Sequence, residues 1–241
     1  MDILGIGFDR LGLDAAAAAI VDRYGRGQRT FVVTANPEFV MLARRDLDVA
    51  AIARAADLVV ADGTGVFLAS RLLGDPLPGR VPGRLLVDRL VPALAGAGSR
   101  LYLLGAGPGV AERAADALRA QVSGLSIVGA EPGSPDPSDD EAVAARVRAA
   151  EPDAIFVAYG MPKQERWIAR NLPRLPSVRL AIGVGGTLDQ LAGRAKVPPR
   201  LLHRLGLEWL WRLAREPWRW RRQRALPVFV LQVLRQRLKS S

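Results

Sequence analysis

Short apolar runs recur through the first 195 residues, and each is followed by a polar or glycine-containing turn and then by a helical pattern. Short buried strands that alternate with helices form a mostly parallel, doubly wound sheet. We therefore predict an α/β fold of the Rossmann-like class. The expected strands span residues 3–8, 30–34, 58–61, 100–104, 125–130, 153–158 and 178–184.

Two of these turns carry side chains suited to chemistry. One reads TANPE over residues 34–38, and the other reads DGTG over residues 62–65. Both follow the carboxyl end of a predicted strand, which is the edge where open α/β sheets bind ligands. We therefore expect Thr34, Asn36 and Asp62 to lie side by side over one crevice.

Each of these three residues has a structural and a chemical interpretation. Asp62 is placed either to cap the helix that follows it or to act as a general base. Thr34 and Asn36 are either turn formers or ligands for a sugar. The chain has no Cys and a single His, His203, which excludes thiolate and multi-His metal sites. With so few alternative bases, Asp62 is the leading candidate, and neither a metal nor another cofactor is expected.

Two further turns point to a nucleotide. The segment GAGPG, with Gly105 and Gly107, opens a helix as phosphate-binding turns do, but it lacks the third glycine of the dinucleotide motif. An NAD-type oxidoreductase is the alternative, with Glu131 as the ribose-binding acid. The turn GMPKQE at 160–165 places Lys163 to face a phosphate, and Gln164 and Glu165 to bond a hydroxyl or base edge. An exposed, capped helix start explains that turn equally well.

The last 46 residues differ from the rest. Residues 196–241 hold 12 Lys and Arg against 2 Asp and Glu, which accounts for the whole formal charge of +10, and four of the five Trp. We predict an α/β body over residues 1–195 and a helical appendage over 196–241, with helices at 201–215, 217–224 and 228–239. Arginines recur at helical spacing within it, at Arg212, Arg215, Arg219 and Arg222.

This appendage is either a solvated cationic face or a surface for anionic lipid headgroups. Nucleic acid is a weaker partner, because the body carries no recognisable nucleic-acid motif. A non-enzymatic membrane-binding module is therefore another alternative. The apolar face of the appendage could also be covered by a neighbouring subunit of a homo-oligomer. No run is long enough for a transmembrane helix, and the N-terminus lacks the basic region of a secretory signal. We expect the body in the cytoplasm.

Seven motifs taken together resemble those of the WecG/TagA/CpsF glycosyltransferases, in the same order and over nearly the whole chain. The motifs are TANPE (34–38), ADGTGV (61–66), RVPG (80–83), LLGAGPGVAE (103–112), YGMPKQExW (159–167), GVGGTLD (183–189) and GLEWLWRLxxEPxR (206–219). The chain departs from the family pattern at Leu85, where an acidic residue is usual. It departs again at 197–199, where VPP replaces the usual RAP and Lys196 is the nearest cation.

The resemblance implies an inverting, metal-independent transfer of an N-acetylmannosamine-type sugar from UDP to a polyprenyl-diphosphate-linked N-acetylglucosamine. The site of action would be the cytoplasmic membrane face, in cell-wall or surface polysaccharide assembly. The family's catalytic aspartate falls on Asp62, its Thr and Asn on Thr34 and Asn36, its Gln on Gln164 and its Arg on Arg80. The complete set expected to bind substrate is Arg80, Gly105, Gly107, Tyr159, Gly160, Lys163, Gln164, Glu165, Gly185, Gly186, Asp189, Arg212, Arg219 and Arg222.

Overall fold

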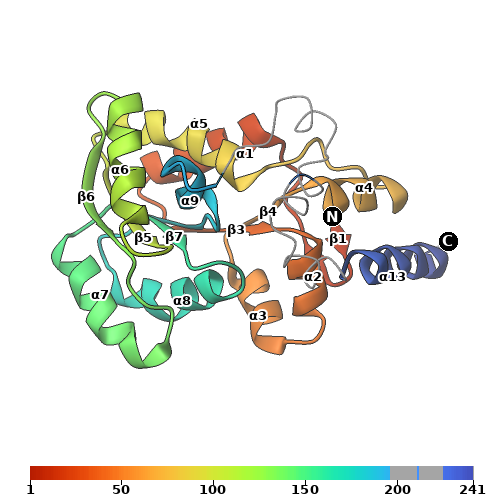
Figure 1. The fold of residues 1–241 in the computed structure, drawn as a ribbon. Helices are drawn as coiled ribbons and strands as arrows, with labels where there is room; N and C mark the ends of the chain where they lie inside the picture. The colour runs from red at the N-terminus through yellow and green to blue at the C-terminus, as the bar shows by residue number, and fades with distance from the viewer. Residues whose placement is uncertain (196–210, 212–224, 241) are drawn as a thin grey trace.

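A six-stranded, fully parallel sheet forms the centre of the computed structural model, which describes residues 1–195, Trp211 and 225–240 (Figure 1). The strand order is β4-β3-β8-β7-β5-β6, so the predicted α/β fold class is confirmed. The strands are β3 (Thr30–Ala35), β4 (Leu58–Ala61), β5 (Arg100–Gly105), β6 (Ser126–Glu131), β7 (Ala154–Ala158) and β8 (Leu180–Gly183).

Helices cover both faces of this sheet (Figure 1). One face carries α2 (Pro37–Ala43), α3 (Leu47–Ala55), α4 (Thr64–Leu72), α7 (Asp140–Ala149) and α8 (Lys163–Asn171). The other carries α1 (Leu13–Gly25), α5 (Gly83–Gly96), α6 (Val110–Gln121) and α9 (Thr187–Leu191). Right-handed crossovers explain the division, because a chain that reverses its direction across a sheet must place its next helix on the opposite face.

Alternate residues of each strand supply the two cores. In β3, Val33 and Ala35 pack on the α2 side, whereas Val32 packs on the α5 side. The neighbouring strand is in register, with Val32 opposite Leu58 and Ala35 opposite Ala61. Both sides of these strands are buried, as expected for a parallel sheet covered by helices on each face.

The first predicted strand, at 3–8, is wrong. The chain forms a separate antiparallel hairpin instead, with β1 (Asp2–Ile3) paired to β2 (Ile6–Gly7). Leu4 and Gly5 turn it, with φ of 56° and 88°, and Gly5 N donates to the Asp2 carboxylate. The short polar side chain and the glycine therefore favour a tight turn over one continuous strand.

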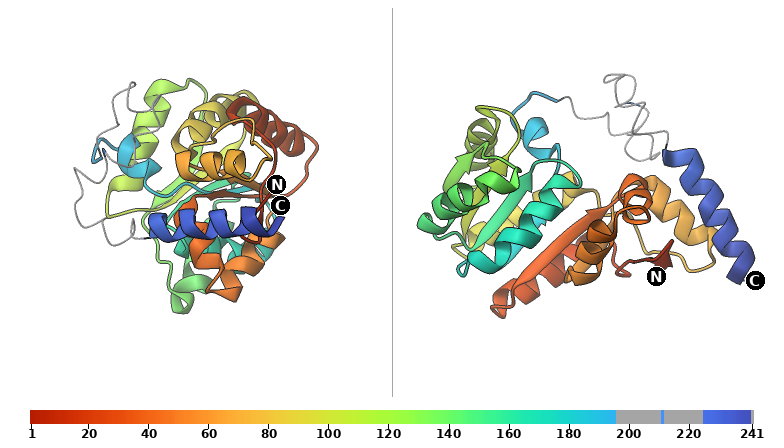
Figure 2. Two further views of the ribbon diagram at one scale, coloured as in Figure 1. Left: turned by 90° about the vertical axis from the view of Figure 1, so that its right-hand side faces the viewer. Right: turned by 90° about the horizontal axis from the view of Figure 1, so that it is seen from below.

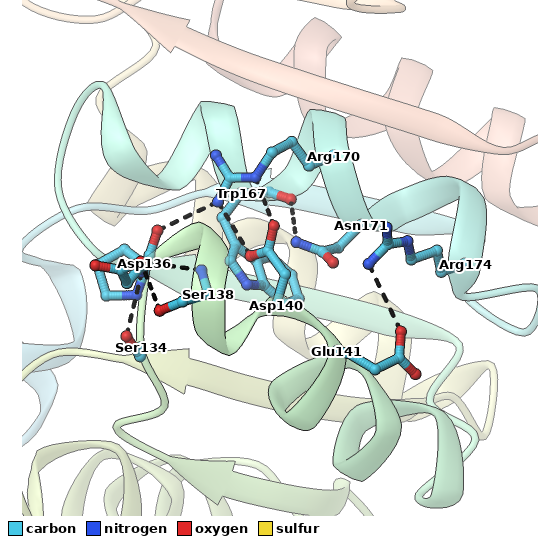
Figure 3. Close-up of polar contacts among 10 residues, drawn as sticks. Ser134, Asp136, Ser138, Asp140, Glu141, Trp167, Arg170, Asn171 and Arg174 are labelled. Carbon is cyan, nitrogen blue, oxygen red and sulfur yellow. Dashed lines mark hydrogen bonds and ion pairs between the residues drawn. The ribbon is translucent and has the colours of Figure 1, made fainter.

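A partly buried ion pair joins α7 to α8 (Figure 3). The Arg170 guanidinium donates to both Asp140 carboxylate oxygens, at 2.6 and 3.0 Å, and to Pro135 O at 3.2 Å. Burial on its own would raise the pKa of Asp140, but hydrogen bonds from Arg170 and Asn171 and the nearby cationic charge hold that pKa below its usual value. The pair anchors the helix that carries the GMPKQE segment.

The C-terminal helix α13 (Ala225–Ser240) packs against α2 and α4, beside the small hairpin (Figure 2). It extends the predicted 228–239 helix at both ends. Phe229 and Val233 are buried in the α2 side of the core, so this part of the appendage is tied to the body. The other two predicted tail helices, and the 195/196 boundary, involve residues outside the described ranges. Within those ranges no helix has the length and apolar character needed to cross a bilayer.

Replacement of Arg170 by Met should lower the free energy of unfolding by about 2 kcal/mol at pH 7, because it leaves the Asp140 carboxylate buried without its cation. The loss should shrink as the pH falls through the lowered pKa of Asp140, where protonation removes the charge. Urea unfolding of wild type and variant at pH 7 and pH 3 measures both effects. Arg148→Met, which breaks the exposed pair with Glu141, is the matched control. Equal losses in the two variants would contradict this account.

Candidate active site at the carboxyl edge of the sheet

The two predicted polar corners lie side by side at the carboxyl ends of β3 and β4. Asp62 N donates to Ala35 O at 2.9 Å, which carries the sheet pairing into the corner. Gly65 lies so close to Pro37 that an added Cβ would meet Pro37 Cγ at 2.5 Å. Glycine is therefore required there by the close approach of the two turns.

Thr34 and Asn36 have defined contacts with the protein. The Thr34 hydroxyl, which is half-buried, donates to Gly183 O at 3.2 Å, so its oxygen keeps lone pairs that can accept from a ligand. The Asn36 side-chain oxygen accepts from Phe39 N at 2.9 Å and caps α2. The side-chain oxygen of Asn36 therefore has the structural role that the turn-forming interpretation predicts.

Three helices begin around this corner. The start of α2 touches α4 at Pro37 and Gly65, and Gly83, the first residue of α5, lies against the Thr34 side chain. The N-cap residue of α4 is Gly63, with φ of 89°, so Asp62 lies one residue before the N-cap. Free N–H groups and dipoles at helix N-termini favour negative charge, so the corner is suited to an anionic ligand.

Arg80 is held beside the same corner. Val81 N donates to Ala61 O at 2.8 Å, which fixes the RVPG segment along the end of β4. The Arg80 Nη1 donates to Thr64 Oγ1 at 3.2 Å. The predicted grouping of Thr34, Asn36 and Asp62 at one end of the sheet agrees with the paired ends of β3 and β4, and Arg80 lies at the same end.

Gln164 joins the next two turns along the sheet edge. Its Oε1 accepts from Gly160 N at 3.1 Å and from Gly185 N at 3.0 Å, and its Nε2 donates to Glu165 at 2.8 Å. The side chain is buried against Gly183, where an added Cβ would lie 2.5 Å from Nε2. These contacts place Gln164 beneath the turns after β7 and β8. Gln164 was predicted to bind substrate, but the hydrogen bonds described here join it to protein groups.

Glu165 is a buried carboxyl on the core side of the same helix. Only 1% of the residue is exposed, and its Oε2 has no hydrogen-bond partner among the described residues. Burial raises the pKa of Glu165 to about 7, against a smaller opposing effect of the hydrogen bond from Gln164. The Glu165 carboxyl therefore lies behind Gln164 and accepts the hydrogen bond from its Nε2.

The glycine turn after β5 lies farther along the same edge. At Gly105, with φ of 114°, an added Cβ would lie 2.7 Å from the Ala158 backbone, so only glycine fits. An added Cβ at Gly107 would be 3.0 Å from Arg194 Nη1, and one at Gly109 would be 3.2 Å from Arg113 Nη1. Two guanidinium groups therefore lie over this turn.

Neither arginine was predicted from the sequence to lie at this turn. Arg113 stands in the first turn of α6, where the helix dipole disfavours a cation unless an anion is near, so its position was a usable signal. Arg194 follows α9 in a turn, and only the folded structure brings it to Gly107.

The remaining predicted ligands are spread along the edge. Lys163 is exposed at the start of α8, and Gly186 is the N-cap of α9, whose first turn carries Asp189. Tyr159 points to the loop after β6, where its hydroxyl lies close to Gly133 and burial raises its pKa. Arg212, Arg219 and Arg222 lie outside the described residues.

Glu131 does not have the free carboxylate that ribose binding needs. Its oxygens accept from Tyr102 Oη at 3.0 Å and from Arg146 Nε at 2.8 Å. It lines a hollow of about 350 Å³ beside the edge strand β6, on the far side of the sheet from Asp62. A second hollow, of about 330 Å³, is lined by Phe8, Asp9 and Asp57. The oxidoreductase alternative therefore lacks the acidic residue that was expected to bind the ribose.

The chain is similar to known proteins over its whole length. A model of the glycosyl transferase WecG/TagA/CpsF family matches residues 1–241. A protein of Staphylococcus aureus (strain MW2) named N-acetylglucosaminyldiphosphoundecaprenol N-acetyl-beta-D-mannosaminyltransferase is 34% identical over 241 residues, with 99% of this chain and 94% of that protein covered. A protein of the same name from Bacillus spizizenii is 34% identical over 211 residues, covering 88% and 81%.

Substitution of Gly65 by Ala should destabilise the protein by about 1–3 kcal/mol, because the new methyl group overlaps Pro37 and pushes the two corners apart. Gly96→Ala is the matched control, since this glycine is also in a helix and nothing lies within 4 Å of its added Cβ. The control should be neutral or slightly stabilising. Thermal unfolding of both variants tests this, and a Gly65→Ala protein as stable as Gly96→Ala would show that the corners are not in close contact.

Replacement of Glu165 by Gln should change how stability depends on pH. Because the folded-state pKa is raised from about 4.5 to about 7, the protonated carboxyl stabilises the fold below pH 4.5, and that contribution is lost as the pH rises through 7. Relative to Glu165→Gln, wild type should lose at most about 3 kcal/mol between pH 4 and pH 8. Denaturant unfolding at both pH values measures the difference, and a pH-independent difference would contradict a raised pKa.

Proposed function

The chain belongs to the WecG/TagA/CpsF family of glycosyl transferases, and from this premise we propose its reaction. It transfers an N-acetylmannosamine-type sugar from UDP to a polyprenyl-diphosphate-linked N-acetylglucosamine. The names of the relatives include this sugar and this class of acceptor. The observation that carries the proposal is the joined corner at β3 and β4, where Thr34, Asp62 and Arg80 gather beside three helix N-termini.

Asp62 acts as the general base of a single displacement. Its carboxylate takes the proton from the acceptor hydroxyl as that oxygen attacks the anomeric carbon. The bond from this carbon to the UDP oxygen breaks, and UDP leaves with the electron pair. One displacement inverts the anomeric centre, so one carboxylate is enough and no glycosyl-enzyme intermediate forms.

Groups of the chain itself stabilise the diphosphate that leaves. Arg80 lies beside the N-termini of α2, α4 and α5, which present N–H groups and positive dipole ends. Arg113 and Arg194 lie over the Gly105–Gly109 turn. Guanidinium groups pair well with phosphate oxygens, so the proposal assigns charge neutralisation to these side chains and requires no metal.

The location follows from the acceptor. A polyprenyl-diphosphate sugar stays in a bilayer, so the protein works as a peripheral enzyme on the cytoplasmic face of the membrane, in cell-wall or surface polysaccharide assembly. The cationic appendage is suited to anionic headgroups, and its arginines at 212, 219 and 222 are proposed to reach lipid or substrate diphosphate.

Asp62→Asn should lower kcat by about 10²–10⁴-fold, because it removes the base while keeping the shape of the side chain. Binding of UDP, measured by calorimetry, should be unchanged. Asp116→Asn, at an exposed carboxylate on α6, is the control and should keep wild-type turnover. The assay follows UDP release with a UDP-N-acetylmannosamine donor and a polyprenyl-diphosphate-N-acetylglucosamine analogue. Wild-type turnover by Asp62→Asn would rule out this base.

A further inference from the structure

Two parts of the proposed site follow different strands of the sheet, and two other strands separate them. The corner with Asp62 follows β3 and β4, whereas the glycine turn beneath Arg113 and Arg194 follows β5. In the strand order β4-β3-β8-β7-β5-β6, strands β8 and β7 stand between the two parts. The distance from the proposed base to the diphosphate therefore depends on how the turns after β8 and β7 are held.

Hydrogen bonds link the corner to the glycine turn across these two strands. At one end, the Thr34 hydroxyl donates to Gly183 O, at the end of β8. At the other end, Ala106 N donates to Ala158 O at 3.0 Å, which joins the glycine turn to the end of β7. Between these links, Gln164 joins the turns after β8 and β7 through two backbone N–H groups. Gln164 is therefore the middle link along this edge.

The bridge requires one of the two orientations of the Gln164 carboxamide. Its Oε1 accepts from Gly160 N and Gly185 N, so its Nε2 must find an acceptor on the other side. Glu165 supplies that acceptor at 2.8 Å. A flipped carboxamide would direct Nε2 at two N–H donors and would lose both bonds to the turns. The Glu165 carboxyl therefore selects the orientation that forms the bridge.

Neither substrate contact nor packing accounts for an acid at this position. Glu165 is 1% exposed, so its side chain does not reach the open edge of the sheet. Its Oε2 has no hydrogen-bond partner among the described residues, and burial of such an oxygen is costly. An aliphatic side chain would fill the space without that cost. The contact with Gln164 is therefore the interaction that an acid makes here and an aliphatic residue could not.

We propose that Glu165 is a positioning residue of the transfer reaction and acts through Gln164. By fixing the carboxamide of Gln164, it holds the turns after β7 and β8, and with them the spacing between Asp62 and the glycine turn. A small displacement of reacting groups is enough to slow a reaction strongly. The inference rests on the proposed function and deepens it. It also replaces the expectation that Glu165 contacts the substrate.

The first test compares two substitutions of Glu165. Glu165→Gln exchanges one oxygen for nitrogen and keeps an acceptor for Gln164, so its kcat should stay within about threefold of wild type. Glu165→Leu has no acceptor and should lower kcat by about 10–100-fold. The KM for the UDP-sugar should change by less than about threefold, because alignment is lost rather than a substrate contact. Arg170→Met, which disturbs the same helix at another contact, is the control and should keep wild-type kcat.

A double-mutant cycle tests whether Glu165 acts through Gln164. Once Gln164→Leu has removed the bridge, adding Glu165→Leu should change kcat by less than about twofold. Hydrogen exchange at Gly160 N and Gly185 N is measured by NMR without substrate. Both amides should exchange faster in Glu165→Leu than in wild type or Glu165→Gln. Circular dichroism shows whether each variant is folded.

Three outcomes would overturn the proposal. Folded Glu165→Leu with wild-type kcat would show that the acceptor is not needed. Glu165→Gln, whose change is too small to prevent folding, would contradict the proposal by losing more than about tenfold in kcat. A further loss of about tenfold on adding Glu165→Leu to Gln164→Leu would show that Glu165 acts independently. If wild type transfers no N-acetylmannosamine, the proposed reaction is refuted, and amide exchange still decides whether Glu165 holds the bridge.

Discussion

The close contact between the ends of β3 and β4 is the constraint on which the rest of the site depends. Sheet pairing continues past the last strand residues through the hydrogen bond from Asp62 N to Ala35 O. Pro37 packs so closely against Gly65 that a larger residue at position 65 would overlap it. Two turns far apart in the chain are thereby held as one polar corner. The helices α2, α4 and α5 begin around this corner, and their N-termini favour negative charge.

The second corner is held by a buried polar bridge. Gln164 bonds the turns after β7 and β8 through Gly160 N and Gly185 N, and Thr34 bonds Gly183 O between them. Burying Glu165 next to this bridge disfavours the charged carboxylate, and its pKa rises accordingly. The bridge and the buried carboxyl are therefore joined by the hydrogen bond from Gln164 to Glu165 beneath the sheet edge.

Much of the fold could be predicted from the sequence, because buried parallel strands are continuous apolar runs whose ends are marked by glycine and polar residues. The β3 and β4 corners were predicted for the same reason. The N-terminal hairpin was not, because Leu4 and Gly5 turn a run that reads as one strand. The burial of Gln164 and the position of Arg194 were not predicted. A local sequence pattern does not determine which way a side chain points, or which distant residues the fold places beside it.

The most direct test of the central claim is the position of bound donor. We expect a crystal structure with UDP-N-acetylmannosamine, or with UDP, to place the diphosphate at the carboxyl edge of the sheet, within hydrogen-bonding distance of Arg80 or of the Gly105–Gly109 turn. The sugar should then be directed toward Asp62. Nucleotide bound in the hollow lined by Phe8, Asp9 and Asp57, with none at the carboxyl edge, would contradict the assignment of this corner as the active site.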